Sequence, residues 1–191
     1  MKTAFSLPFT AALGLILSSP LMPLAAAPEV RPGREGDLAK LVAPVHGQKT
    51  CYARTYDSEH LKKNPRQQTK SLMLQIQYHY PEKREPHQQP SYLYRLKAQM
   101  KGQKAALQAS GDCAPDGAKI RCSVECDGGE FFLELERASG SLRLTLDQPL
   151  RMGSCGEEDN VEWAAKADDK VFRLWEANAA TCPSIDSETD R

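Results

Sequence analysis

The sequence lacks the short motifs that most often identify an enzyme. Its 191 residues contain no GxSxG serine motif, no phosphate-binding P-loop and no GxGxxG dinucleotide fingerprint. A CxxC pair, which would favour a structural zinc ion, is also missing. From these absences we predict a protein that has no catalytic residue, no resident metal and no cofactor.

An excess of charge of either sign is missing as well. The chain has 25 basic and 25 acidic residues, and removal of Lys2 with an N-terminal leader would leave 24 basic against 25 acidic residues. A near-neutral chain has no broad positive surface for phosphate backbones or anionic lipids. We therefore expect neither a nucleic-acid partner nor attachment to a charged membrane surface.

No apolar run is long enough to span a membrane. The apolar stretch Ala11–Leu17 follows Lys2 and precedes the small residues Ala25–Ala27. This order predicts that residues 1–27 are a secretory signal peptide. Because no cysteine lies at the expected cleavage point to carry a lipid, we expect a soluble mature protein that is periplasmic or secreted.

The exported part divides into three segments. Residues 28–49 carry several prolines and glycines with little periodicity, which is typical of an extended arm, although Asp37–Val42 could form one helical turn. Residues 50–182 hold the periodic segments and all six cysteines, and we interpret them as a single disulfide-stapled β domain. Residues 183–191 form a polar C-terminal tail.

Alternating apolar and polar residues between positions 118 and 136 predict the central hairpin of this domain. Two such runs meet at Gly128-Gly129, and paired glycines favour a type I′ turn because both of its central positions need positive φ. A two-residue loop there places Cys126 opposite Phe131. A slip of one residue would turn the apolar side chains to solvent, so the alternation disfavours it.

Neighbouring segments give further hairpins that share the same apolar face. Alternation begins at Leu72, and turn-forming residues then recur along the chain. In the predicted registers, Ala98 faces Leu107 and Cys113 faces Ile120. The expected turns are Gly102-Gln103, Pro115-Asp116-Gly117, Ser139-Gly140 and Asp168-Asp169.

The last predicted hairpin pairs Val161–Ala165 with Val171–Trp175. With it, the chain has seven to eight antiparallel strands, mostly in a meander, and such a sheet must bury its apolar face. The sequence therefore predicts an all-β fold, either a small closed barrel of calycin-like form or a sandwich. One short N-terminal helix, capped by Asp57 or Ser58 and ending before Pro65, is expected to be a lid or plug at one end.

The polar face of the predicted sheet gives an independent check on the registers. They place four alternating charges side by side across four strands, which are Asp112, Arg121, Glu136 and Arg143. Opposite charges on neighbouring strands stabilise a sheet. The charge row therefore favours the same registers as the apolar face.

The even number of cysteines predicts three disulfides in an oxidising compartment. Cys122 and Cys126 are four residues apart on one strand, roughly 13 Å at strand rise, which is too far for a mutual bond. Among the possible connectivities we favour Cys51–Cys182, Cys113–Cys122 and Cys126–Cys155. A nucleophilic role for Cys155 is disfavoured because the acidic residues that follow it oppose thiolate formation.

The candidate binding patch is acidic. A Cys126–Cys155 bond would bring five carboxylates together, which are Glu125, Asp127, Glu157, Glu158 and Asp159. They could hold calcium or a basic partner, although a solvated loop face is the favoured interpretation. His79 and His87 flank one loop and could meet around a metal, but solvated positions are favoured there too.

The run Cys122-Ser-Val-Glu-Cys126-Asp-Gly-Gly, with CYART at 51–55 and Gly-Ser-Cys-Gly at 153–156, resembles an uncharacterised group of small exported proteins of Gram-negative bacteria. The resemblance covers short pieces between residues 51 and 182. It implies export from a Gram-negative cell and brings no known activity with it.

These observations lead to one functional prediction and two alternatives. We predict a non-catalytic periplasmic β protein that binds a small apolar ligand inside the sheet or an envelope protein at its loop end. The first alternative is a hydrolase that uses carboxylates between Glu125 and Asp159. The second is a structural role in the envelope.

Overall fold

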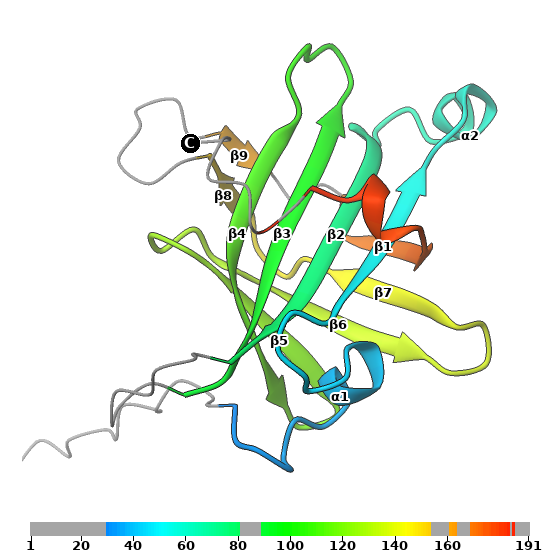
Figure 1. Cartoon of the computed structure of the whole chain (residues 1–191). Helices are drawn as coiled ribbons and strands as arrows, with labels where there is room; N and C mark the ends of the chain where they lie inside the picture. Colours follow the sequence, from blue (N-terminus) through cyan, green and yellow to red (C-terminus); the bar gives the residue numbers. More distant parts are fainter. Residues whose placement is uncertain (1–29, 81–88, 154–160, 164–168, 184, 186–191) are drawn as a thin grey trace, which may run out of the picture.

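The structure, a computed structural model, describes residues 30–80, 89–153, 161–163, 169–183 and 185. Its main sheet is a closed antiparallel barrel in the strand order β1-β10-β7-β6-β5-β4-β3-β2 (Figure 1). The predicted all-β barrel is therefore confirmed, and the sandwich is not what the chain forms. The barrel strands are β1 (Lys49–Thr55), β2 (Thr69–His79), β3 (Ser91–Met100), β4 (Leu107–Asp116), β5 (Lys119–Val124), β6 (Glu130–Glu136), β7 (Ser141–Thr145) and β10 (Val171–Glu176).

The remaining described elements are short. Strands β8 (Leu150–Met152) and β9 (Val161–Trp163) form a separate two-stranded sheet. The helices are α1 (Leu38–Leu41), α2 (Ser58–Lys63) and the 3-10 helix η2 (Ala179–Thr181). Within the described ranges, no helix has the length and apolar character needed to cross a bilayer.

Alternate side chains of each strand fill the barrel. In β3, every second residue from Tyr92 to Ala98 is buried, while the residues between them are partly exposed. This period of two is what the sequence pattern predicts for a strand with one apolar face. Burial of these faces provides the main driving force for the fold.

Turn geometry decides which register each hairpin adopts. The β3–β4 register is as predicted, with Ala98 opposite Leu107. Between β4 and β5, Cys113 faces Cys122 instead of the predicted Ile120. The turn lies one residue later than expected because Gly117, at φ +60°, takes the left-handed position. The shift is two residues, so the same side chains still point inward.

The same shift changes the predicted charge row. Asp112 faces Ser123 rather than Arg121. Arg121 instead pairs with Glu130 on β6, at 3.4 Å between a guanidinium nitrogen and a carboxylate oxygen.

The central β5–β6 hairpin is shifted by four residues. Phe131 faces Cys122 rather than Cys126, because residues 125–128 form the loop in place of a two-residue glycine turn. Gly128 lies where a Cβ atom would be 2.4 Å from the side chain of Val124 and 2.9 Å from the carbonyl oxygen of Arg151. A glycine is therefore required at position 128 because the neighbouring atoms pack closely against it, and not because of the predicted turn.

The predicted pairing of the last two strands is wrong. Strand β9 pairs with β8, whereas β10 lies between β7 and β1 and closes the barrel. Trp163 of β9 packs over Phe172 of β10, with ring centroids 5.3 Å apart. The buried Asp169, just before β10, accepts hydrogen bonds from the backbone N–H groups of Gln68 and Thr69. The predicted turn residue Asp168 lies outside the described residues.

The seam between β1 and β10 turns the meander into a barrel. Its register has two residue pairs, Tyr52 with Glu176 and Ala53 with Trp175. The guanidinium carbon of Arg54 lies 4.5 Å from the ring centroid of Trp175, which adds a cation–π contact between the two strands.

Two disulfides reinforce this arrangement. Cys51 of β1 bonds Cys182, which follows η2, with Cα atoms 5.8 Å apart. Cys113 of β4 bonds Cys122 of β5, and both residues are buried. These are two of the three pairs that we predict from the sequence.

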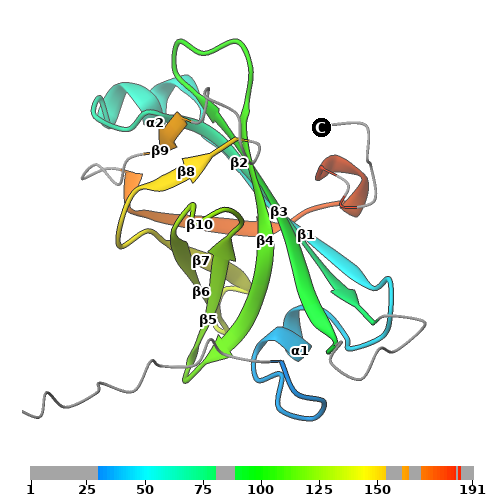
Figure 2. The same cartoon turned by 90° about the vertical axis from the view of Figure 1, so that its left-hand side faces the viewer.

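The arm before β1 closes one end of the barrel. Leu38 and Leu41 of α1 are buried, together with Val30 and Val42 on either side. Figure 2 shows α1 at the lower end of the barrel. The expected plug was α2, which Asp57 caps as predicted, but α2 buries no residue. Its sequence SEHLKK offers too little apolar surface to close the core.

One charge cluster stands out on the polar face. Glu136 accepts hydrogen bonds from Arg173, Arg143 and Ser141. These bonds, led by the one with Arg173, lower the pKa of Glu136 to about 2. The predicted contact with Arg143 is present, but in the register Arg143 lies opposite Glu134 rather than Glu136.

We expect loss of the Cys51–Cys182 bond to destabilise the fold more than loss of Cys113–Cys122. The bonded residues are separated by 131 and 9 positions, respectively. The chain-entropy model gives about 5 and about 2.5 kcal/mol for loops of these sizes. Urea unfolding of the two paired Cys→Ala variants measures both losses, and a larger loss in the short-loop variant would contradict the expectation.

We expect the contribution of Glu136 to stability to depend on pH. Because the pKa of Glu136 is about 2 in the fold against an ordinary 4.5, its stabilisation is complete above about pH 4.5 and is lost as the pH falls through about 2. Glu136→Gln should lower the free energy of unfolding at pH 7, and the difference from the wild type should shrink toward pH 2.

Urea titrations between pH 7 and pH 2 test this dependence. Glu59→Gln is the control, because its ion pair with Lys63 is exposed and contributes little. A loss in Glu136→Gln that stays constant over the whole pH range would rule out the ionised carboxylate as the source of the stability.

Candidate functional site

Aromatic rings occupy the barrel interior. Tyr94 meets Phe131 edge to face at 5.0 Å between centroids, and Tyr78 meets Tyr92 in the same way at 5.0 Å. All four side chains are buried. These rings pack against one another inside the barrel, and the site that we describe lies at the end of the barrel.

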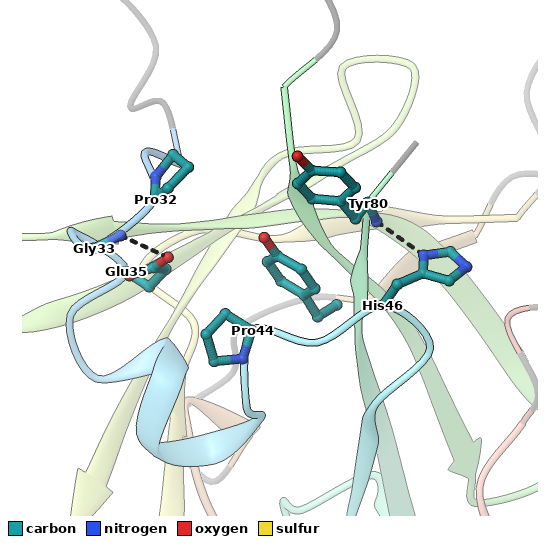
Figure 3. A pocket seen from close by; sticks show the side chains of 7 residues that line it. Pro32, Gly33, Glu35, Pro44, His46 and Tyr80 are labelled. Atoms are coloured by element: carbon teal, nitrogen blue, oxygen red, sulfur yellow. Dashed lines mark hydrogen bonds between the residues drawn. The ribbon is translucent and has the colours of Figure 1, made fainter. Parts of the chain in front are cut away.

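A pocket of about 680 Å³ opens between the arm and the end of β2 (Figure 3). We call it the arm pocket. Its described lining consists of Pro32, Gly33, Glu35, Pro44, His46, Tyr78 and Tyr80. The volume lies within the range of small-molecule sites in proteins.

A turn in the arm positions the carboxylate of Glu35. The N–H of Arg34 donates to the carbonyl of Arg31, with Pro32 and then Gly33, at φ +78°, between them. This order is typical of a type II turn, in which the second central residue needs positive φ. The N–H of Gly33 donates to Oε1 of Glu35 at 2.9 Å, and Glu35 is only 6% exposed. The turn thus holds a buried carboxylate in the pocket wall.

Two tyrosines connect the arm to the barrel beneath the pocket. Tyr78 packs against Tyr92, whose hydroxyl group donates to the carbonyl of Val42 at 3.3 Å. Burial raises the pKa of Tyr92, and the negative charge of Glu35 raises it further. Tyr92 is therefore a neutral hydrogen-bond donor that fixes the arm over the barrel end.

His46 forms the other side of the pocket. Its Nδ1 accepts a hydrogen bond from the N–H of Tyr80 at 3.0 Å (Figure 3). The centroid of its ring lies 5.3 Å from that of the His79 ring. The predicted partner of His79 at a metal site, His87, lies outside the described residues.

The predicted acidic patch is only partly described. Glu125 accepts a hydrogen bond from Ser110 at 3.0 Å, and Asp127 lines a second pocket of about 430 Å³ that also includes Arg151. Cys126 is disulfide-bonded. Its predicted partner and the other three acids lie outside the described residues, namely Cys155, Glu157, Glu158 and Asp159.

Cys126 and Asp127 take an unusual backbone conformation. Their φ angles are 58° and 57°, and the N–H of Gly128 donates to the carbonyl of Glu125 to close the turn. Left-handed φ is strained for residues other than glycine, although aspartate and asparagine tolerate it best. Among the described residues, no group of three His, Cys, Asp or Glu side chains could hold a metal ion.

Sequence reasoning did not find the arm pocket. The Arg-Pro-Gly-Arg run at 31–34 is typical of a type II turn, and Glu35 follows it directly. This turn is the signal in the sequence that could have pointed to the site. The burial of Glu35 depends on how the arm folds over the barrel, which no local pattern encodes. Comparisons with protein-family models, curated proteins and solved structures find no match for the chain.

We expect Asp127 to act through its backbone preference rather than its charge. Asp127→Asn should change the free energy of unfolding by less than about 0.5 kcal/mol, whereas Asp127→Ala should cost about 1 kcal/mol because alanine tolerates left-handed φ poorly. Urea unfolding measures both variants. Equal losses in the two would show that the carboxylate itself stabilises the turn.

Proposed function

We propose that this chain is an exported, non-catalytic binding protein and that the arm pocket is its binding site. The observation that carries the proposal is the lining of this pocket, in which tyrosine and proline side chains surround one buried carboxylate. Ligand sites in proteins commonly combine apolar and aromatic walls with a few convergent polar groups.

This proposal puts the site at the end of the barrel rather than inside the sheet. A ligand would enter from solvent and contact the arm on one side and the end of β2 on the other (Figure 3). Tyr80 is 36% exposed and Val45, next to the lining residues Pro44 and His46, is 57% exposed. An open rim of this kind accepts either a small molecule or a side chain of a partner protein.

Two features support export to the periplasm. Residues 1–27 have the order of a signal peptide, and the disulfides Cys51–Cys182 and Cys113–Cys122 are typical of an oxidising compartment. The hydrolase alternative has less support. Of its carboxylates, Glu125 is engaged by Ser110 and Asp127 belongs to a strained turn, while the others lie outside the described residues.

Tyr80→Ala tests the site, because it removes one exposed wall of the arm pocket without opening the core. We expect small aliphatic and aromatic fragments to shift the amide NMR signals of Gly33, His46 and Tyr80, and Tyr80→Ala to weaken this binding at least fivefold. The matched control is Trp175→Ala, another exposed aromatic outside the pocket, which should leave the affinity unchanged. Fragment binding that maps elsewhere, or none at all, would refute the proposed site.

A further inference from the structure

The arm pocket contains one buried carboxylate, that of Glu35, with few partners among the described residues. Of the described lining residues, Glu35 alone carries a carboxylate, and Nδ1 of His46 accepts the N–H of Tyr80. The side chain of Glu35 has one hydrogen-bond donor among the described residues, the N–H of Gly33. No ion pair between described residues includes Glu35.

A carboxylate in this position has unused capacity. It can accept about four hydrogen bonds, and the N–H of Gly33 supplies one of them. The hydroxyl of Tyr92 is directed to the carbonyl of Val42 and does not neutralise the carboxylate. A positively charged ligand would supply the missing counter-charge from the solvent side of the pocket.

The remaining walls suit the rest of such a ligand. Tyr78 and Tyr80 place aromatic rings in the lining, and the faces of aromatic rings attract cations. Pro32 and Pro44 add apolar surface from the arm. In Figure 3, Glu35 lies on the arm side of the pocket and Tyr80 lies at the end of β2.

We propose that the arm pocket binds an organic cation, an ammonium group on an apolar stem, with the carboxylate of Glu35 as its counter-ion and Tyr78 and Tyr80 as its aromatic walls. This inference rests on the proposed function and names the ligand class. A divalent metal fits the site poorly, because calcium and magnesium need six or more oxygen ligands and the walls are apolar. The cation could belong to a free small amine or to a lysine side chain of a partner protein, since both present the same chemistry.

The test compares ligands that differ only in charge. Choline and 3,3-dimethylbutan-1-ol have nearly the same shape, but only choline is a cation. In amide NMR titrations of the mature protein, choline should bind at the arm pocket at least tenfold more tightly than the neutral alcohol. Glu35→Gln, which keeps the shape of the side chain, should remove this preference and leave the affinity for the alcohol within twofold.

Two further arms complete the experiment. Butylammonium mimics a lysine side chain, so its affinity relative to choline indicates whether a lysine or a quaternary amine is the preferred source. Glu125→Gln removes a carboxylate outside the pocket and should change none of these affinities. If Glu35→Gln does not fold, Tyr80→Leu keeps an apolar wall without a π face, and it should weaken choline at least fivefold and the alcohol less than twofold.

The failures of the two proposals can be told apart. Equal affinity for choline and the alcohol at the arm pocket, or a choline affinity that Glu35→Gln leaves intact, overturns the cation proposal and leaves the pocket as a binding site. If none of the three probes shifts the signals of the arm pocket, the cation proposal is overturned, and if the neutral fragments also give no shifts there, the proposed function fails with it.

Discussion

The strands of the barrel must all turn their apolar side chains toward one interior, and this parity constrains everything else in the structure. A register error of one residue would move a strand's buried set to solvent. A register error of two or four residues keeps the same side chains inside the barrel and changes only which residues of the neighbouring strand lie opposite them. Hydrophobic burial therefore fixes the facing of each strand firmly, whereas local turns decide how far each strand slides along its neighbour.

This difference explains what could be predicted from the sequence. Alternation predicted the inward face of the central strands. The predicted turn after β4 placed Cys113 within reach of Cys122, and Cys51 and Cys182 were paired because both lie near the ends of the domain. The β4–β5 and β5–β6 registers differ from the predicted ones by two and four residues. The turn at Gly117 lies one residue later than predicted, and a loop at 125–128 replaces the predicted two-residue turn at Gly128-Gly129. Strand β10 was paired wrongly because its partners, β7 and β1, are chosen by closure of the barrel. No short-range pattern carries that information.

The candidate site was less accessible to prediction than the fold. Glu35 lies in a segment with many prolines and glycines, where a charged residue is ordinarily solvated. The arm that carries it makes three separate contacts, which are the turn around Gly33, the burial of Leu38 and Leu41 of α1, and the Tyr92–Val42 hydrogen bond. Of the acidic patch predicted from the sequence, only Glu125 and Asp127 lie among the described residues. The arm, the segment for which the sequence pattern predicted the least structure, thus forms one side of the site.

The bond between Cys51 and Cys182 also determines how the molecule carries force. One cysteine lies near the start of the first barrel strand and the other follows the last strand, so the bond runs in parallel with the short β1–β10 seam. Tension applied through residues before and after this pair passes from sulfur to sulfur. The polypeptide between the two cysteines then bears none of that tension, and the strands cannot peel apart one by one from the ends. The resistance of the barrel to stretching from its ends therefore depends on one covalent bond, whereas its shape depends on the many weak contacts of the core.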